Sequence, residues 1–508
     1  DCGATTITTT AVDIRGKIVR SASLFNHAVQ QPGGTKGWVI WDLEEIWSKL
    51  CQTTKQVCQG LKTQTIRAAV VTTFGVDGSL VNKQGNLLYP VISWQDSRTA
   101  YLTQEIARKI SAREIFARTG YQFIPFNTLL RLLWLKKNAP NILDKSARWM
   151  MMPGLINFRL TGEFSIDPTS ASTMMAMNMR RRDWDEQVLS LAGVDSSLFP
   201  EWVQPGEIIG HVTRQAARQT SLPQGVPVVT AGHDTQCAVV GSGAREREVV
   251  LSSGTWEVLM LRTSQFEPNE KAFEAGLIIE CDPVPGMWNP QIIMMASGVL
   301  EWIRKHFYCD VSEGEKTYQL MISEATKIPP GSGGVIVVPS FFPGTGPTRK
   351  SKIQGTILGL TINTERSQVF RAALEGLSFQ LAESIQTFNS ALDCDSRSIR
   401  VIGGGSKNNL WNQIRADVTG LPVIAVSQGE ATILGATLLG FVGTGLFSSV
   451  DEGQREMDFG ERVFEPSSYR IYQDLLGVYL KISPSLEEAH ERIKLFDNFD
   501  EKERQNTF

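Results

Sequence analysis

The sequence is poor in the residues that build metal centres and disulfide frameworks. It contains 5 histidines, and its 7 cysteines are scattered singly with no Cys-x-x-Cys pair. An odd number of widely spaced cysteines is typical of reduced thiols in a cytoplasmic protein. No histidine pair stands beside them at the spacing of zinc ligands. The sequence therefore predicts a cytoplasmic location, no disulfide bonds and no zinc site.

An excess of charge of one sign is also lacking. The 50 Lys and Arg residues nearly balance the 53 Asp and Glu residues, so the chain has no basic excess of the kind that marks a nucleic-acid binder. A charge-free stretch at residues 431–450 has the length of a membrane span, but it contains four glycines and three threonines. These glycines are typical of close contacts in a buried helix. We predict neither a nucleic-acid nor a membrane partner.

The sequence is long, and apolar runs alternate in it with helical patterns. A chain of 508 residues corresponds to two to four domains of about 150 residues each, and 42% hydrophobic residues exclude disorder. Apolar runs alternate with helical patterns, which predicts an α/β fold. The polar, glycine-rich residues 241–248 place a boundary near 245, which gives domains 1–244 and 245–485. The densely charged residues 486–508 predict a surface helix and a loose tail.

Hydrophobic periodicity locates several elements. The strands and helices that it predicts are a strand at 66–72, a hairpin at 79–92 that turns at 82–86, a strand at 226–230, a helix at 364–389, and a helix at 408–418 that ends at Gly420.

Two turns with small hydroxyl residues recur, one in each half of the chain. The first lies in residues 1–6 and the second in residues 249–256, each next to β-rich sequence. Alone, the first turn is typical of a tight hairpin. Two such turns favour a triphosphate held by backbone N–H groups and hydroxyls, one turn from each half. The chain begins at Asp1 inside this motif and without Met, so we expect a short N-terminal strand before it.

A strand, a glycine turn and a helix follow one another at residues 401–418. The glycines allow close approach of a flat ligand or a phosphate, and the helix N-terminus favours negative charge. The segment is neither a P-loop, because no Gly-Lys-Ser/Thr follows, nor a dinucleotide fingerprint, because the glycine spacing differs. A tight connection from strand to helix accounts for it equally well.

Asp234 stands where an apolar strand ends and a helix begins. It could be an N-cap, or a general base at the carboxyl end of a strand. Both interpretations stay open on this residue alone, and His233 beside it is more typical of a packed or orienting residue. Asp77 lies in a turn, and residues 94–98 (Trp-Gln-Asp-Ser-Arg) offer a donor, an acceptor and an aromatic face that suit a polyol.

Together these motifs resemble the FGGY family of carbohydrate kinases, over essentially the whole chain. Residues 126–135 are similar to the first family signature, except that Arg131 stands where the family usually has Lys. Residues 355–360 (G-x-I-x-G-L) and 368–375 (Q-V-x-x-A-A-L-E) are similar to the second signature throughout. The resemblance implies a two-domain actin/hexokinase/Hsp70-like fold, a duplicated ribonuclease H-like unit with ATP and sugar in the inter-domain cleft.

Within the family, four segments resemble the kinases of L-fuculose: residues 72–78, 232–236, 251–257 and 296–302. This implies conversion of L-fuculose to L-fuculose 1-phosphate at a terminal hydroxyl in L-fucose catabolism. Residues 339–347 resemble the general family pattern, and residues 406–423 also resemble kinases of autoinducer-2. L-Rhamnulose, D-xylulose and autoinducer-2 are therefore the alternative substrates. A non-enzymatic ATP-switched module on the same fold is the alternative from another class.

The resemblance also implies a role for each candidate residue. Asp234 would be the catalytic base for the C1 hydroxyl of the sugar, and Asp1 would hold Mg²⁺. The expected phosphate and nucleotide contacts are Ala4, Thr5, Thr6 and Thr8 in the first half and Thr255, Gly403, Gly404 and Gly405 in the second. The expected sugar contacts are Gly75, Asp77, Arg98, His233 and Thr235. The partners implied are a ketose and ATP, and the family pattern is compatible with a homodimer.

Overall fold

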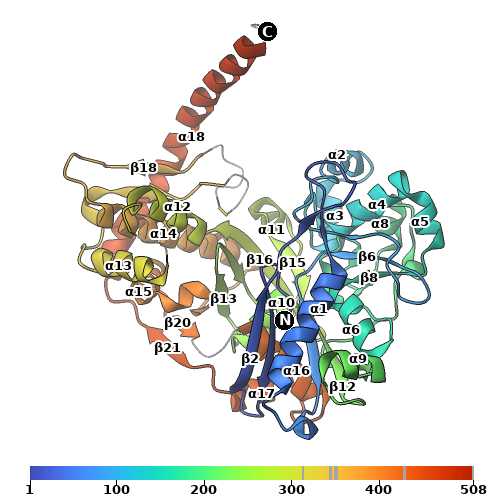
Figure 1. Cartoon of the computed structure of the whole chain (residues 1–508). Helices are drawn as coiled ribbons and strands as arrows, with labels where there is room; N and C mark the ends of the chain where they lie inside the picture. The colour runs from blue at the N-terminus through green and yellow to red at the C-terminus, as the bar shows by residue number, and fades with distance from the viewer. Residues whose placement is uncertain (312–313, 343–345, 348–352, 427–430, 506–508) are drawn as a thin grey trace. The chain divides into compact units, whose positions relative to one another are not determined.

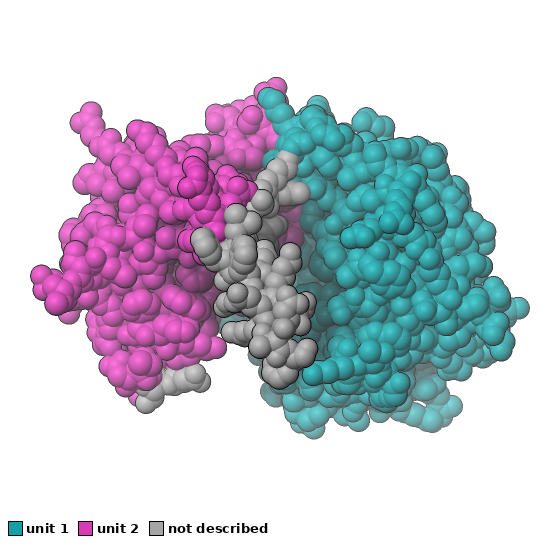
Figure 2. Space-filling view, turned by 90° about the horizontal axis from the view of Figure 1, so that it is seen from above, with its two compact units in different colours: residues 1–246, 262–290, 428–459 teal, residues 247–261, 291–427, 460–508 magenta. Residues whose placement is uncertain are grey.

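The computed structural model has a mixed α/β architecture, as the alternation of apolar runs and helical patterns predicts (Figure 1). It describes residues 1–311, 314–342, 346–347, 353–426 and 431–505. The chain divides into two compact units, coloured teal and magenta in Figure 2, and neither unit is continuous in sequence. Unit 1 comprises residues 1–246, 262–290 and 428–459, and unit 2 comprises residues 247–261, 291–427 and 460–508. The domain limits 1–244, 245–485 and 486–508 stay a prediction.

The elements of unit 1 come mostly from the first half of the chain. They are β1 (Thr6–Val12), β2 (Ile18–Phe25), β3 (Val29–Gln30), β4 (Val39–Trp41), α1 (Leu43–Cys58), β5 (Ala69–Thr73), β6 (Gly78–Val81), β7 (Val91–Ile92), α2 (Leu102–Ala107), α3 (Ala112–Thr119), α4 (Thr128–Asn138), α5 (Pro140–Lys145), β8 (Arg148–Met151), α6 (Met152–Thr161), α7 (Pro168–Ser172), β9 (Met177–Asn178), β10 (Asp183–Trp184), α8 (Glu186–Leu191), β11 (Ile208–His211), α9 (Arg214–Thr220), β12 (Pro227–His233), α10 (Asp234–Gly241), α11 (Glu270–Ala275), β15 (Ile278–Cys281), α16 (Ala431–Gly443) and α17 (Val450–Glu456).

The elements of unit 2 come from the second half, and β16 (Trp288–Met295) crosses from one unit's residues to the other's. They are β13 (Glu248–Ser253), β14 (Trp256–Met260), α12 (Ser297–Phe307), α13 (Glu315–Thr326), β17 (Ile336–Val338), β18 (Thr356–Leu358), α14 (Arg366–Leu392), β19 (Ser398–Ile402), α15 (Asn409–Thr419), β20 (Val423–Val426), β21 (Glu461–Phe464) and α18 (Tyr469–Gln505). Short 3₁₀ helices lie at 63–65, 196–198, 332–334 and 404–407.

The central sheet of unit 1 positions the residues that follow its strands. Strand β12 pairs in parallel with β5, with Val229 opposite Val70, and β11 flanks β12 in antiparallel register. Cys2 forms a parallel bridge to Thr73 and an antiparallel bridge to Ile7, so residues 1–3 connect the β1–β2 hairpin to β5. Because parallel strands end at the same edge of a sheet, the residues after β5 and β12 emerge together.

Helices α10 and α16 contact each other through glycines. A Cβ atom on Gly241 would lie 1.8 Å from the carbonyl oxygen of Ala431, and one on Gly435 would lie 1.8 Å from that of Cys237. Only glycine allows two backbones to approach so closely. The interpretation of residues 431–450 as a buried helix is confirmed for α16. Among the described residues, no helix is both long and apolar enough to cross a membrane.

The sheet of unit 2 repeats the plan of the first. Strand β13 pairs in parallel with β19, β19 pairs in parallel with β20, and β14 returns antiparallel to β13. The predicted helix at 364–389 is α14, which begins with a reciprocal capping box between Glu365 and Gln368 and contributes many buried side chains to the core. The predicted stop of α15 at Gly420 is confirmed by a left-handed φ of 72°.

The predicted hairpin at 79–92 is partly wrong. Its turn forms, because the Asn82 N–H donates to the Asn86 carbonyl at 3.0 Å. Next to the turn, Val81 and Leu87 form an antiparallel bridge, but the longer pairings of the two arms are with other strands: β6 pairs with β8, and β7 pairs with β4. Sequence periodicity finds strands but does not decide which strands pair. In the predicted charged tail, residues up to 505 belong to the long helix α18, and residues 506–508 lie outside the described part.

Candidate functional site

Asp234 stands at the junction between β12 and α10. It is the first residue of α10, and His233 occupies the N-cap position without a capping hydrogen bond from its side chain. The carboxylate of Asp234 accepts from the N–H of Thr235 at 2.6 Å, so it does not cap the N–H groups further into the helix. Its side chain is 25% exposed. The N-cap interpretation of Asp234 is wrong, and the carboxylate is open to a ligand.

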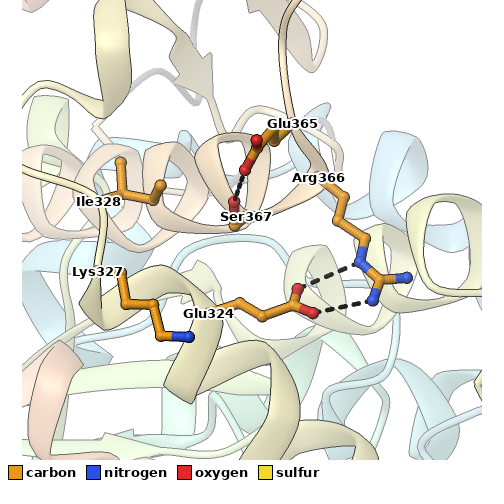
Figure 3. A pocket seen from close by; sticks show the side chains of 6 residues that line it. All are labelled: Glu324, Lys327, Ile328, Glu365, Arg366 and Ser367. Carbon is orange, nitrogen blue, oxygen red and sulfur yellow. Dashed lines mark hydrogen bonds and ion pairs between the residues drawn. The ribbon is translucent and has the colours of Figure 1, made fainter.

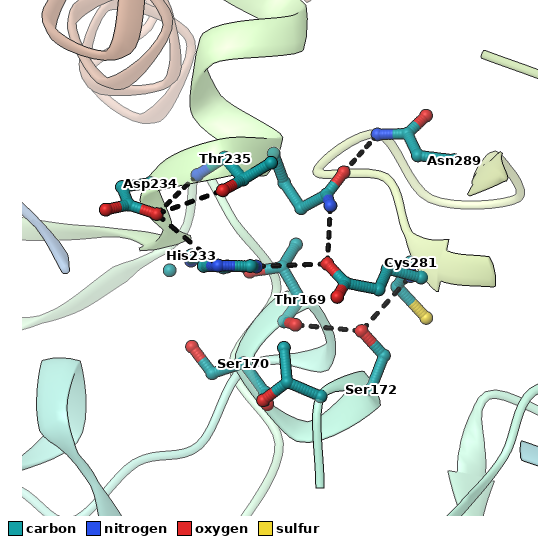
Figure 4. Close-up of polar contacts among 12 residues, drawn as sticks. Thr169, Ser170, Ser172, His233, Asp234, Thr235, Cys281 and Asn289 are labelled. Carbon is teal, nitrogen blue, oxygen red and sulfur yellow. Dashed lines mark hydrogen bonds and ion pairs between the residues drawn. The ribbon is translucent and has the colours of Figure 1, made fainter. Parts of the chain in front are cut away.

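The two oxygens of Asp234 differ in their contacts. Oδ1 accepts from the backbone and hydroxyl of Thr235 at 2.6 and 3.3 Å and lies 3.4 Å from Nε2 of His233 (Figure 4). Oδ2 has no hydrogen-bond partner among the described residues. One oxygen is held in place while the other can accept a proton, which is the arrangement that a general base needs.

His233 lies between two carboxylates. Its Nδ1 is 3.0 Å from Oε2 of Glu280, and its Nε2 faces Oδ1 of Asp234. Burial lowers the pKa of His233, but the adjacent Glu280 carboxylate together with Asp234 and Asp167 raises it to about 9. His233 is therefore an imidazolium at neutral pH, with Nδ1 hydrogen-bonded to Glu280 and Nε2 in an ion pair at 3.4 Å with Oδ1 of Asp234.

Gly75 and His233 are brought together by the ends of β5 and β12. A Cβ on Gly75 would lie 2.9 Å from Nε2 of His233 and 3.0 Å from a methyl group of Thr173. Gly232 is equally constrained, because a Cβ there would lie 2.1 Å from the hydroxyl of Thr169. The predicted sugar-site residues Gly75, His233 and Thr235 thus belong to one cluster in unit 1.

Asp77 is fully buried, in contrast to Asp234. Its carboxylate pairs with Arg131 at 2.6 Å and also accepts from the indole N–H of Trp41 and the backbone N–H of Trp94. Burial raises the pKa of Asp77, and Arg131 opposes that rise. Arg131 also donates to the carbonyl of Val76 at 2.8 Å, so its side chain holds the turn that follows Gly75.

Arg98 is buried as well. Its guanidinium forms a two-bond ion pair with Asp96 at 2.8 and 2.7 Å and lies 4.2 Å from the ring centroid of Trp38. It also donates to Tyr89 and Gln31. The side chain fixes the loop at 94–98, and direct contact of Asp77 or Arg98 with a sugar stays a prediction.

The first hydroxyl turn lies at the N-terminal end of β1. The N–H of Gly3 donates to the carbonyl of Thr6 at 3.0 Å, and the side chains of Thr5 and Thr6 are exposed. Thr8 is buried and shares a hydrogen bond with Ser23 at 3.0 Å, so its hydroxyl is engaged inside the hairpin. Ala4 and Asp1 are half-buried at the same turn.

The second hydroxyl turn and the glycine turn lie side by side in unit 2. Thr255 is exposed between β13 and β14, and its carbonyl accepts from the N–H groups of Ala296 and Gly298, at the start of α12. A Cβ on Gly405 would lie 2.0 Å from Oγ of Ser253, and one on Gly403, which has a φ of 80°, would lie 2.8 Å from the carbonyl of Ser253. The structure brings Gly403, Gly404 and Gly405 against the turn that carries Thr255.

Beneath these two turns lies a buried ion pair that sequence reasoning missed. Arg415 pairs with Glu257 and donates to Oγ of Ser253 at 2.8 Å, and its guanidinium lies 3.6 Å from the ring centroid of Trp411. The side chains of Arg415 and Glu257 are completely buried. Buried Glu280 in unit 1 was also missed, although an acid inside the apolar run 278–281 is a signal that could have indicated it.

No cage for a metal ion is present within the described part of the chain. No three His, Cys, Asp or Glu side chains there stand close enough to hold a metal. Mg²⁺ is commonly held by one or two carboxylates together with phosphate oxygens, so a single carboxylate such as Asp1 is a fitting donor.

Two hollows lie elsewhere. One, of about 490 Å³ in unit 2, is lined by residues around α13 and the start of α14, where Arg366 is paired with Glu324 at 2.9 Å (Figure 3). Another, of about 540 Å³ in unit 1, has mainly aliphatic walls and includes only Asp1 and Thr8 of the candidate residues. Neither hollow contains the Asp234 cluster.

The class of the protein, a two-domain carbohydrate kinase, follows from comparison with known families. Residues 1–241 match the model of the N-terminal domain of the FGGY family of carbohydrate kinases, and residues 249–444 match the model of its C-terminal domain. The chain belongs to the FGGY family of carbohydrate kinases, which confirms the resemblance in the sequence motifs.

Individual relatives agree with this family. The chain is 41% identical over 477 residues to the L-fuculokinase of Escherichia coli K12, which covers 92% of this chain and 96% of that protein. It is 27% identical over 494 residues to an autoinducer-2 kinase of Salmonella paratyphi B. That match covers 93% of this chain and 91% of the other protein. The fold matches the crystal structure of a xylulose kinase from Rhodospirillum rubrum with a TM-score of 0.85 over 96% of this chain and 98% of that one, at 21% identity.

Proposed function

We propose that this carbohydrate kinase transfers the γ-phosphoryl group of ATP to the C1 hydroxyl of L-fuculose, which gives L-fuculose 1-phosphate in L-fucose catabolism. The choice of sugar is supported by the 41% identity over 477 residues to the E. coli L-fuculokinase. The choice of reaction is supported by one observation above all: the carboxylate of Asp234 is 25% exposed, one of its oxygens is held, and the other has no hydrogen-bond partner among the residues that the structure describes.

In the proposed mechanism, Oδ2 of Asp234 accepts the proton of the C1 hydroxyl. The sugar oxygen forms a bond to the γ-phosphorus while the bond between that phosphorus and the β,γ-bridging oxygen breaks, which releases ADP. Phosphoryl transfer leaves the protein mainly with positioning and charge stabilisation. Gly75, His233 and Thr235 would contact the sugar, and the imidazolium of His233 keeps Oδ1 of Asp234 in place.

The phosphate groups would bind at the hydroxyl turns. Backbone N–H groups and hydroxyls of Ala4, Thr5 and Thr6 in unit 1 and of Thr255 in unit 2 can hold phosphate oxygens without adding charge. The adenosine could contact the backbone at Gly403, Gly404 and Gly405, because glycine has no side chain to block its approach. Asp1 would hold Mg²⁺, which neutralises negative charge on the phosphates when it is bound.

The test is an ADP-release assay with the purified chain. L-Fuculose, L-rhamnulose, D-xylulose and autoinducer-2 are compared by kcat/KM, and the position of the phosphate on the product is assigned by NMR. We expect the highest kcat/KM with L-fuculose and phosphate on C1. A higher kcat/KM with another ketose would identify that ketose as the substrate in place of L-fuculose. ATP consumption that no sugar stimulates would favour the non-enzymatic ATP-switched module.

Two further expectations accompany the proposal. All seven cysteines are free thiols in the structure, which fits the predicted cytoplasmic location. A homodimer stays a prediction, and light scattering on the 56.2 kDa chain distinguishes it from a monomer.

A further inference from the structure

Glu280 is a buried acid for which the proposed mechanism has no step. It lies on β15, its side chain is 2% exposed, and it reaches the junction of β12 and α10. A buried carboxylate is costly unless it is paired and hydrogen-bonded, so its partners indicate what it does. All of its partners are donors.

The two oxygens of Glu280 receive donors from three elements. Oε1 accepts from the hydroxyl of Tyr121, which follows α3. Oε2 accepts from Nδ1 of His233 at 3.0 Å and from the side-chain amide of Gln236 on α10 at 2.5 Å. Gln236 is in turn held by the amide of Asn289. The carboxylate of Glu280 is therefore held by donors on several sides. Its hydrogen bond with Nδ1 in turn orients the His233 ring.

Nε2 of His233 then points toward Asp234. With Nδ1 bound to Glu280, Nε2 lies 3.4 Å from Oδ1 of Asp234. This oxygen also accepts two hydrogen bonds from Thr235, and the result is that Oδ2 is the oxygen left for a substrate hydroxyl.

We propose that Glu280 is a positioning residue for phosphoryl transfer: it keeps the His233 ring charged and oriented so that Asp234 presents Oδ2 to the sugar. The proposal rests on the proposed function, because it assigns Glu280 a role behind the proposed base. It requires no direct contact between Glu280 and a substrate.

The charges around His233 give this role a pH dependence. Glu280 on β15, Asp234 on α10 and Asp167 at the start of α7 face the ring, and Tyr121 is the neighbouring neutral group. Burial lowers the pKa of His233, but Glu280 and the two aspartates raise it to about 9, above its ordinary 6.5. The ring stays charged through neutral pH and loses its charge as the pH rises through about 9. The ion pair between His233 and Oδ1 of Asp234 therefore also weakens as the pH rises through about 9.

The first experiment measures His233 directly. The chain has 5 histidines, so the ring signals of ¹⁵N-labelled protein can be followed by NMR from pH 5 to 10, and His233→Gln identifies the signal that belongs to His233. We expect titration near pH 9 in the parent protein and at least about one pH unit lower in Glu280→Gln. Titration of the parent His233 near 6.5 overturns the proposal, whether or not any variant folds and whichever sugar is the substrate.

The second experiment measures activity against pH. In the parent, kcat falls above about pH 9, and in Glu280→Gln this alkaline limb moves to lower pH with little change in KM for the sugar. Tyr121→Phe is the matched control, because it removes a donor to the same carboxylate but keeps the carboxylate and its contact with His233. Its alkaline limb should stay near the parent's.

The two experiments separate the two proposals. A uniform loss of activity in Glu280→Gln with an unmoved alkaline limb shows a merely structural role and overturns the positioning proposal. If instead His233 titrates near 9 and responds to Glu280→Gln while no ketose is phosphorylated, the link between Glu280 and His233 holds and the proposed function fails.

Discussion

The two hydroxyl turns share a backbone plan but differ in what supports them. In unit 1 the turn joins residues 1–3 to β1 beside β5, and in unit 2 it joins β13 to β14 beside β19. The first turn is held by Asn26, whose amide donates to the carbonyl of Gly3 at 2.9 Å and whose N–H donates to that of Thr5 at 2.8 Å. The second is backed by the buried pair of Arg415 and Glu257.

The two units also differ in the residues that follow their parallel strands. In unit 1, β12 leads to a carboxylate whose side chain is 25% exposed, Asp234. In unit 2, β19 leads to the glycines at 403–405, which offer backbone only. The comparison shows that a repeated strand–turn–strand frame presents a carboxylate after a strand of one unit and glycine backbone after a strand of the other, because the residues just after each strand differ.

The largest effect is expected at the carboxylate of unit 1. Asp234→Asn keeps the size of the side chain but removes the proton acceptor, so kcat should fall by about 10³-fold or more. ADP release measures turnover, and calorimetry should show that ATP still binds. Turnover within about tenfold of the parent, only about 1.4 kcal/mol, would contradict the assignment of the base.

The next effect concerns the buried pair of unit 2. Arg415→Met leaves the Glu257 carboxylate buried without its partner, which should cost about 3–5 kcal/mol in the free energy of unfolding. The double variant with Glu257→Met should recover most of that loss. Asn26→Ala, the equivalent support in unit 1, should cost only about 1–2 kcal/mol because no charge is left unpaired. Urea unfolding measures all three, and equal losses in the two units would remove the contrast.

A smaller effect is expected at the glycine turn. Gly405→Ala places a Cβ 2.0 Å from Oγ of Ser253, whereas Gly404→Ala places one no closer than 4.0 Å to the same residue's carbonyl oxygen. Overpacking of about 1–3 kcal/mol at Gly405 should displace the turn and weaken ATP binding by about tenfold. Calorimetric Kd values for ATP check this. Equal affinities of the two variants would show that ATP does not depend on the shape of this turn.

The smallest effect is expected at the exposed hydroxyls. Thr255→Val removes one hydrogen-bonding group, so the Kd for ATP should rise about fivefold, about 1 kcal/mol, with little change for the sugar. Thr5→Val tests the turn of unit 1 in the same assay. If Thr255→Val leaves the affinity for ATP unchanged, Thr255 belongs to the turn and not to the nucleotide site.

Several features of this protein could be predicted from local sequence. The α/β class, strand β12, helices α14 and α15 and the stop at Gly420 follow from periodicity and from residues with strong backbone preferences. The pairing of β6 with β8 could not be predicted, because these strands are about seventy residues apart and hydrophobic alternation does not choose a partner.

The candidate site shows the same division. Asp234 and His233 are visible in the sequence because they follow a predicted strand. The partners of Glu280 and Arg415 are not, because each contacts a residue far away in the chain, and nothing local connects Glu280 with His233 or Arg415 with Ser253.

The sequence by itself determined the family, the α/β class and several of the strands and helices, because these depend on residue types at short spacing. Only the tertiary structure decided which carboxylate is open and which is buried. Asp234 and Asp77 both follow strands of one sheet, yet one is 25% exposed and the other is enclosed by Arg131, Trp41 and Trp94. Burial and pairing are properties of the assembled fold, because they are set by neighbours that come from distant parts of the chain.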